Sequence, residues 1–267
     1  MLFKNKICGK CGNSYDVAFE KCPVCDTPDS EFKNYNIPSK ICWLSAWQQI
    51  AIFLVGFAYG GFLAFELLYS GLFSNLENGL SVFLANCLTY VSCLLVFLAI
   101  SFKRIKHVIS HFTDWKKYLI GVGFAVILFA GSYIISVITD QFGVETNENQ
   151  SLINDFLLKY PVASFLAFGL IGPIVEEFTY RVGLYSFIRR LNKYAAIIIT
   201  AIVFAFIHFS FTTENIANEF LNLPSYIFGG LVMSIAYEVA GPSCSITCHS
   251  LYNLATLVIL LIKLGAK

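Results

Sequence analysis

The sequence predicts an all-α polytopic membrane protein with about seven transmembrane helices, six to eight being compatible with it, preceded by a small N-terminal zinc ribbon. The first observation is composition: 57% of the 267 residues are hydrophobic and 13% are charged, whereas a soluble domain carries about 25% charged residues. The second is that the apolar residues form blocks of about 20, long enough to cross a bilayer core of about 30 Å as a helix. The third is a polar, cysteine-bearing stretch before the first block.

The apolar blocks and the loops between them predict the spans and their orientation. The predicted spans run at about 43–69, 80–102, 118–138, 160–188, 194–210, 224–241 and 244–262. Lys and Arg gather in the N-terminal tail and in the 103–117 and 189–193 connections, whereas two of the other loops are acidic. Because basic loops stay in the cytoplasm, we expect a cytoplasmic N-terminus and a location in the bacterial cytoplasmic membrane. Lys263 and Lys267 would then lie outside, which keeps an even number of spans open.

Four cysteines in the tail have the spacing of metal ligands. Two CxxC pairs, separated by ten residues, come from Cys8, Cys11, Cys22 and Cys25. Four thiolates can hold one tetrahedral Zn²⁺, and such a closed site is structural because no position is left for catalysis. The spacing resembles that of bacterial zinc ribbons. Two disulfides or free thiols are the alternative, and a reducing cytoplasmic tail disfavours disulfides.

The chain is therefore expected to have three parts. These are a zinc-ribbon-like domain at residues 1–30, a linker at 31–42 and a transmembrane helical domain at 43–267. A module of about thirty residues depends on its metal for folding. We expect the ribbon to recognise a protein partner or to regulate the membrane domain, and we expect no nucleic-acid partner.

Three ionisable residues interrupt the apolar span at 160–188. The stretch "IVEEFTYR" contains Glu176, Glu177 and Arg181. Charged residues inside a membrane span usually face the bundle interior and have a function. Glu177 and Arg181 are four residues apart and can form an ion pair on one helix face, whereas Glu176 points about 100° away. A buried packing network made by all three is the alternative.

Two later spans contribute further polar groups. His208 lies four residues after Phe204, and His249 lies four residues before Asn253, so each pair shares one helix face. A single membrane histidine is more often a packing or hydrogen-bonding residue than a catalyst. Together with the glutamate pair, however, the two histidines and the amide supply a base, imidazoles and a hydrogen-bond donor.

These motifs resemble those of a known family. EExxxR (Glu176, Glu177, Arg181), FxxxH (Phe204, His208) and HxxxN (His249, Asn253) occur in order, as in the CPBP intramembrane proteases, also called the Abi or CAAX-protease family. The resemblance covers about residues 118–262. It implies an intramembrane endopeptidase that hydrolyses a peptide bond of a membrane-associated protein or peptide.

The resemblance also implies a role for each residue. Glu176, assisted by His208, would activate a water molecule, and His249 and Asn253 would donate hydrogen bonds to the oxyanion. Glu177 and Arg181 would be the supporting pair. A metal-free glutamate mechanism is favoured. Two histidines and a glutamate could also bind Zn²⁺, so a catalytic metal stays open.

Two other kinds of function remain as alternatives. A non-catalytic family member would act as a membrane scaffold or regulator, for instance in bacteriocin self-immunity, and a transporter would use the polar cluster to bind a solute. The complete motif set disfavours the scaffold, and the absence of inverted sequence repeats disfavours the transporter.

The depths of the motif residues in their spans raise a difficulty. At a rise of 1.5 Å per residue, Glu176 and His208 lie about 21 Å from the basic 189–193 turn, whereas His249 lies about 9 Å from the start of its own span. The three residues can meet only where helices break or tilt. We expect breaks at Gly172–Pro173 and Gly241–Pro242.

Overall fold

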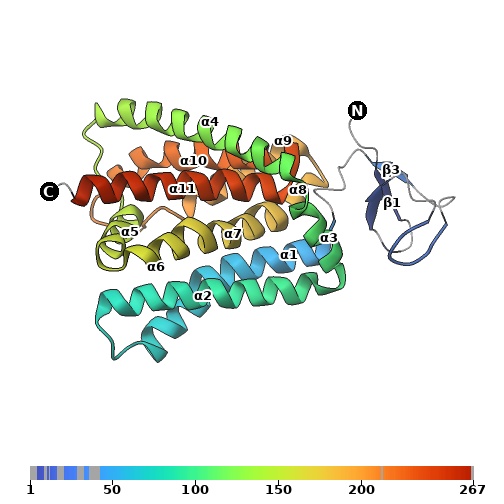
Figure 1. The fold of residues 1–267 in the computed structure, drawn as a ribbon, viewed down its shortest axis with the longest axis horizontal. Helices are drawn as coiled ribbons and strands as arrows, with labels where there is room; N and C mark the ends of the chain where they lie inside the picture. The colour runs from blue at the N-terminus through green and yellow to red at the C-terminus, as the bar shows by residue number, and fades with distance from the viewer. Residues whose placement is uncertain are drawn as a thin grey trace.

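A small β-sheet and a bundle of helices follow one another along the chain, with the sheet at one end of the bundle (Figure 1). The computed structural model describes residues 5–8, 11, 13–16, 21–28, 33–35, 43–211 and 213–265. The sheet is antiparallel in the order β2–β1–β3. Its strands are β1 (Asn5–Ile7), β2 (Ser14–Asp16) and β3 (Lys33–Tyr35).

The third strand extends the sheet past its predicted boundary. β3 lies within the segment predicted as a linker, residues 31–42, and pairs with β1 through Ile7 and Lys33. A three-residue strand whose partner lies far away in sequence has no local signal, so the sequence could not predict it. The rest of that predicted linker lies outside the described residues.

Eleven α-helices and five short 3-10 or π-helical stretches form the described part of the bundle. They are α1 (Ala46–Leu54), η2 (Val55–Ala64), η3 (Leu67–Leu72), α2 (Asn78–Ser101), η4 (Phe102–Arg104), α3 (Ile105–Phe112), α4 (Trp115–Asp140), α5 (Glu148–Lys159), α6 (Pro161–Leu166), η5 (Ala167–Ile171), α7 (Gly172–Glu177), η6 (Phe178–Tyr185), α8 (Ser186–Arg189), α9 (Lys193–Phe206), α10 (Ile216–Ala240) and α11 (Pro242–Gly265).

Six of these helical segments are long and apolar enough to cross a membrane. They are Ala46–Leu72, Gly79–Arg104, Trp115–Asp140, Pro161–Arg189, Ile216–Ala240 and Pro242–Lys263. The span predicted at 194–210 is a shorter apolar helix, α9, of 14 residues. The outer surface of the bundle exposes large apolar side chains, as a bilayer requires. The chain is an integral membrane protein.

Helix boundaries follow local capping signals in most places. Ser45 forms a capping box with Gln48 at the start of α1, and the Asn192 side chain caps α9. The helix predicted at 224–241 instead begins at Ile216, capped by Asn215, so Pro224 lies inside it. The predicted start of this span is therefore later than the observed start of the helix.

One of the two expected helix breaks is absent. The chain stays helical from Pro161 to Arg189, and Pro173 lies in the first turn of α7, after the π-helical η5. A missing N–H disturbs a helix least at such a position. At the other site Gly241 does end α10, with a positive φ of 85° that favours glycine.

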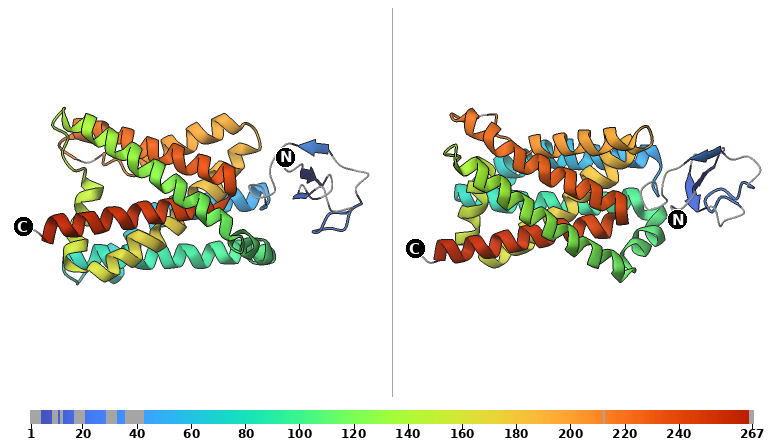
Figure 2. Two further views of the ribbon diagram at one scale, coloured as in Figure 1. Left: turned by 45° about the horizontal axis from the view of Figure 1, so that its top comes forward. Right: turned by 90° about the horizontal axis from the view of Figure 1, so that it is seen from above.

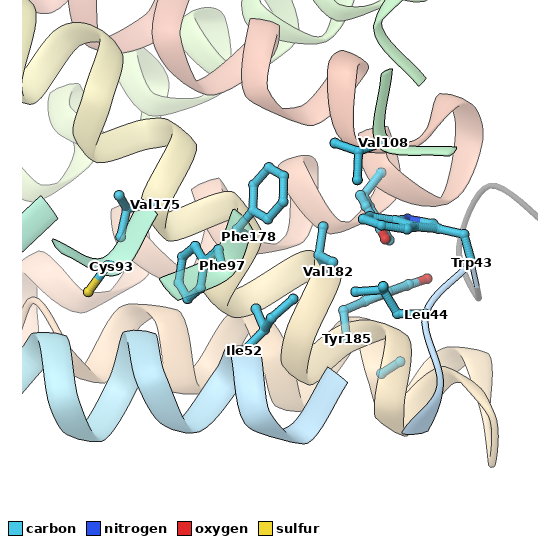
Figure 3. Packing of buried hydrophobic residues seen from close by; sticks show 12 residues of the cluster. Trp43, Leu44, Ile52, Cys93, Phe97, Val108, Val175, Phe178, Val182 and Tyr185 are labelled. Carbon is cyan, nitrogen blue, oxygen red and sulfur yellow. The ribbon is translucent and has the colours of Figure 1, made fainter. Parts of the chain in front are cut away.

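The motif-bearing segment 172–189 packs at the centre of the bundle. Its residues Val175, Phe178 and Val182 meet Ile52 of α1 and Phe97 of α2 in one apolar cluster (Figure 3). A Cβ on Gly183 would lie 2.8 Å from the backbone nitrogen of Phe53, so glycine permits this close approach of η6 and α1. On the other side of the bundle α11 packs on α4, and α10 packs on α9 (Figure 2).

Candidate active site

A cavity of about 680 Å³ lies among the helices and contains four of the six polar motif side chains in its wall. These are Glu176, His208, His249 and Asn253. Glu177 and Arg181 do not line the cavity and are fully buried behind it. The structure therefore brings the three motifs together and divides them into a cavity-facing group and a buried pair.

Glu176 is the carboxylate that faces the cavity. It lies on α7 next to Glu177, and consecutive helical residues point about 100° apart, so the two carboxylates face different surroundings. The Glu176 side chain is 20% exposed, and its Oε2 lies 3.8 Å from Nε2 of His249. Among the described residues, this oxygen has no hydrogen-bond partner. That oxygen is itself buried, whereas the Glu176 side chain as a whole lines the cavity and can meet a molecule there.

Glu177 and Arg181 form the buried ion pair that their spacing predicts. Nη1 of Arg181 lies 2.9 Å from Oε1 of Glu177. Arg181 also donates through Nη2 to the carbonyl of Gly230 at 3.3 Å, and its guanidinium carbon lies 4.6 Å from the centre of the Phe204 ring. The pair thus ties η6 to α9 and α10.

The same carboxylate orients His249. Nδ1 of His249 donates to Oε1 of Glu177 at 3.0 Å, and the imidazole is 5% exposed. Because the carboxylate accepts at Nδ1, the other ring nitrogen, Nε2, is left for the cavity. Phe204 packs edge-on against this ring at 5.8 Å between centroids. His249 is therefore held by the pair that lies behind it.

His208 lies in the turn after α9, and one of its ring nitrogens has a lone pair that is free to accept a hydrogen bond. Its Nδ1 lies 2.8 Å from the carbonyl oxygen of Phe204. A carbonyl only accepts hydrogen bonds, so Nδ1 carries the proton and Nε2 is the unprotonated nitrogen of the neutral ring. The imidazole also contacts the Phe204 ring, with 4.8 Å between centroids.

Two residues outside the motifs position His208. Tyr226 of α10 stacks on the imidazole at 4.6 Å with an angle of 18° between the planes, and its hydroxyl donates to Oδ1 of Asn147 at 3.2 Å. Nδ2 of Asn147 donates back to the carbonyl of His208 at 3.2 Å. Sequence reasoning missed both residues. Asn147 has the signature of a helix N-cap, but nothing in the sequence distinguishes Tyr226 from the other aromatic residues of the spans.

A buried glutamate fixes the loop that carries His208. Glu219 accepts from the backbone N–H of Glu148 at 3.2 Å and from that of Ser210 at 3.1 Å. It is buried, and it joins the start of α5 to the α9–α10 connection. Sequence analysis used this residue only as one of the acidic residues that mark a non-cytoplasmic loop.

Asn253 is anchored by one of its two amide hydrogens. Nδ2 donates to the carbonyl of Phe168 at 2.9 Å. An amide nitrogen carries a second hydrogen, which this contact leaves for a ligand in the cavity. The arrangement places Asn253 one helical turn from His249, as the HxxxN spacing predicts.

The four tail cysteines form a second candidate site. Their ligand atoms all lie within 4.8 Å of one another, with sulfur–sulfur distances of 3.4 Å for Cys8–Cys25, 3.5 Å for Cys11–Cys22 and 3.4 Å for Cys11–Cys25. Zinc–sulfur bonds of about 2.3 Å in a tetrahedron require sulfur–sulfur distances of about 3.8 Å, so a metal fits with a small expansion. All four are free cysteines in this structure.

The pKa values of two of these thiols are shifted in opposite directions. Hydrogen bonds from the Thr27 side chain and backbone lower the pKa of Cys25 to about 6, whereas burial raises that of Cys22 to about 12. A bound dication would supply the charge that stabilises all four thiolates. Among the described residues these cysteines are the one group whose ligand atoms gather in this way, and Glu176, His208 and His249 do not form such a group.

Comparisons with known proteins agree with the motifs. Residues 158–255 match a protein-family model described as "Type II CAAX prenyl endopeptidase Rce1-like". The chain is 27% identical over 158 residues to the UPF0177 protein YvdC of Lactococcus lactis subsp. lactis (strain IL1403), an alignment that covers 56% of each protein. The chain thus spans little more than half the length of this relative. No solved structure matches. The resemblance to the CAAX-protease family is confirmed: the segment from residue 158 to residue 255, which contains every motif residue from Glu176 to Asn253, is similar to the Rce1-like endopeptidases.

Proposed function

We propose that this protein is an intramembrane endopeptidase that hydrolyses a peptide bond of a membrane-associated protein or peptide inside the 680 Å³ cavity. The observation that carries the proposal is the convergence of a carboxylate, two imidazoles and an amide on one cavity within an apolar bundle. The similarity of residues 158–255 to a family of membrane endopeptidases supports it.

In the proposed reaction Glu176 is the general base. Its carboxylate takes a proton from a water molecule in the cavity, and the resulting hydroxide adds to the carbonyl carbon of the substrate. The Nε2 lone pair of His208 accepts a hydrogen bond from the same water and orients it. When the carbon–nitrogen bond breaks, the proton held by Glu176 passes to the departing amine.

His249 and Asn253 stabilise the tetrahedral intermediate in this scheme. The second amide hydrogen of Asn253 and an N–H at Nε2 of His249 would both donate to the oxyanion. Nε2 carries a hydrogen together with Nδ1 only in the imidazolium form. Glu176 and Glu177 flank this ring at 3.8 and 3.0 Å. We keep catalysis without a metal as the proposal, since the geometry of Glu176, His208 and His249 does not gather three ligand atoms.

The test is a comparison of cleavage products in membranes that contain matched variants. Glu176→Gln keeps the shape of the side chain and removes the base, whereas Glu66→Gln makes the same change at an exposed site outside the cavity. Mass spectrometry of new peptide ends should find the same products absent with Glu176→Gln and with His208→Ala, and present with Glu66→Gln. Identical products from all the variants would refute the proposed protease activity and would favour the non-catalytic scaffold instead.

For the tail we propose a structural Zn²⁺ held by Cys8, Cys11, Cys22 and Cys25 in a ribbon on the cytoplasmic side. The gathering of the four sulfurs within 4.8 Å of one another supports the metal, and the basic loops at the same end support the orientation. We retain residues 1–30 as the core of this domain, extended by β3, and residues 43–267 as the membrane domain, with its protease core at 118–262. A protein partner of the ribbon is part of this proposal.

A further inference from the structure

The cavity is reached from the end of the bundle that lies opposite the β-sheet. Exposed residues from the end of α4 and from the connection to α5 line it, namely Asp140, Glu145 and Thr146. This connection and α5 lie at the far end of the helices from β1 and β3 (Figure 1). Glu176 lines the inner part of the same cavity. A substrate would therefore enter past the α4–α5 connection.

Asn218 and Asn222 of α10 hold this entrance in place. Oδ1 of Asn218 accepts from the backbone N–H of Glu145 at 2.8 Å, and Nδ2 of Asn222 donates to the Glu145 carbonyl at 3.0 Å. These contacts fix the backbone of the loop and leave the Glu145 carboxylate exposed. Neither Glu145 nor Asp140 forms an ion pair with any residue in the described part of the chain.

Among the described residues that line the cavity, the side chains that belong to Asp, Glu, Lys or Arg are all carboxylates. Asp140 and Glu145 lie at the entrance and Glu176 lies inside, and neither lysine nor arginine occurs among the described residues that line the cavity. Arg189 and Lys193 border the 190–192 turn at the other end, whereas Lys159 at the end of α5 lies outside the cavity wall and pairs with Glu77 at 2.9 Å. The remaining polar lining is neutral, with amides and hydroxyls such as Asn149, Gln150 and Ser225.

We infer that the cavity selects neutral or basic peptide segments, presented at the face opposite the ribbon, and rejects acidic segments and free C-terminal carboxylates. This inference rests on the proposed function for its meaning in catalysis. A carboxylate inside a half-buried cavity would meet Glu176, and the described lining residues offer neither lysine nor arginine to pair with it, which makes its desolvation costly. A lysine or arginine of the substrate would be attracted by the two unpaired carboxylates at the entrance.

A binding measurement tests the charge selection without any need for cleavage. Fluorescein-labelled peptides of one apolar sequence carry either two lysines or two glutamates, all with amidated ends, and one further neutral peptide ends in a free carboxylate. Fluorescence anisotropy is recorded with the full-length protein in zwitterionic micelles, after subtraction of binding to empty micelles. We expect the lysine peptide to bind about tenfold more tightly than the glutamate peptide at low salt, and the amidated neutral peptide more tightly than the free acid.

Matched variants assign the preference to the entrance. Asp140→Asn combined with Glu145→Gln should reduce the lysine-to-glutamate ratio by about fivefold, and so should added salt. Asp155→Asn removes one charge from α5, outside the cavity wall, and should retain the ratio. Equal binding of the lysine and glutamate peptides by wild type, or a ratio that survives the double substitution, would overturn the inference.

A blocking experiment tests the face of entry. A bulky maleimide on Thr146→Cys should abolish peptide binding, whereas the same label on Lys193→Cys, exposed at the opposite end, should leave it intact. The reverse result would overturn the proposed route. If the charge preference is observed while Glu176→Gln leaves every cleavage product in place, the proposed protease activity is refuted and the charge-selective cavity is supported.

Discussion

Replacement of Arg181 by methionine should destabilise the protein more than any substitution of an exposed charge. Arg181 and Glu177 are both fully buried and lie 2.9 Å apart. Arg181→Met leaves the Glu177 carboxylate buried, with His249 as a remaining hydrogen-bond partner. The loss of one partner of a buried pair costs about 3–5 kcal/mol of unfolding free energy, and the hydrogen bond to Gly230 adds about 1 kcal/mol.

The double substitution Glu177→Gln with Arg181→Met should recover part of the free energy of unfolding that Arg181→Met alone loses. Both charges are then absent, so no unpaired ion remains buried, and the glutamine oxygen can still accept from Nδ1 of His249. We expect the double variant to lose about 2–3 kcal/mol, which is less than the loss from Arg181→Met alone. The non-additivity would measure the coupling between the two side chains.

Thermal unfolding of the detergent-solubilised protein, followed by tryptophan fluorescence, is the measurement. A loss of about 5 kcal/mol corresponds to a decrease in Tm of about 10–20 °C for a chain of this size. Lys159→Met is the control, because its pair with Glu77 is 51% and 65% exposed, and pairs this exposed contribute little to stability. A double variant that is no more stable than Arg181→Met would refute the assignment of a stabilising buried pair.

Three further substitutions probe the packing, the histidine shell and the ribbon. Gly183→Ala places a Cβ 2.8 Å from a backbone nitrogen of α1 and should lower the free energy of unfolding by about 1–3 kcal/mol. In the control Gly123→Ala the new Cβ meets nothing within 4 Å, and this variant should stabilise α4 by up to about 1 kcal/mol. Equal Tm shifts in the two variants would contradict the close approach of η6 and α1. Tyr226→Leu should lower turnover about tenfold or more and shift the NMR signals of the His208 ring, while Tyr226→Phe retains the stacking and should have a smaller effect; unchanged signals in the leucine variant would exclude a positioning role. Cys22→Ser should weaken metal retention by the tail, measured as zinc per chain during dialysis against a chelator, and undiminished retention would contradict the four-sulfur site.

Local patterns in the sequence were sufficient for the class of the protein and for the faces of its motif helices. Apolar blocks define spans because each residue in lipid must be apolar regardless of its neighbours. A separation of four residues places Glu177 above Arg181, and His249 beside Asn253, in any helix. Hydropathy set the start of the predicted 224–241 span too late, because residues 216–222 of α10 include polar residues that an apolar window leaves out.

The division of roles between the two glutamates required the tertiary structure. From the sequence, Glu176 and Glu177 differ only by a rotation of about 100° on the helix. Which of them meets the cavity, and which meets Arg181 and His249, depends on the packing of α11 and η6 around α7. The same holds for Asn147 and Tyr226, which lie 79 residues apart and still share a hydrogen bond.

By itself, the sequence determined that this is a membrane protein with an ionisable cluster and a cysteine-rich tail, because hydropathy, helical spacing and ligand spacing are properties of neighbouring residues. Only the tertiary structure decided that the cluster surrounds one cavity, that a buried Glu219 fixes the loop of His208, and that the entrance is acidic. Those features depend on distances between segments that are remote in sequence, and these distances are set by side-chain packing that no local pattern contains.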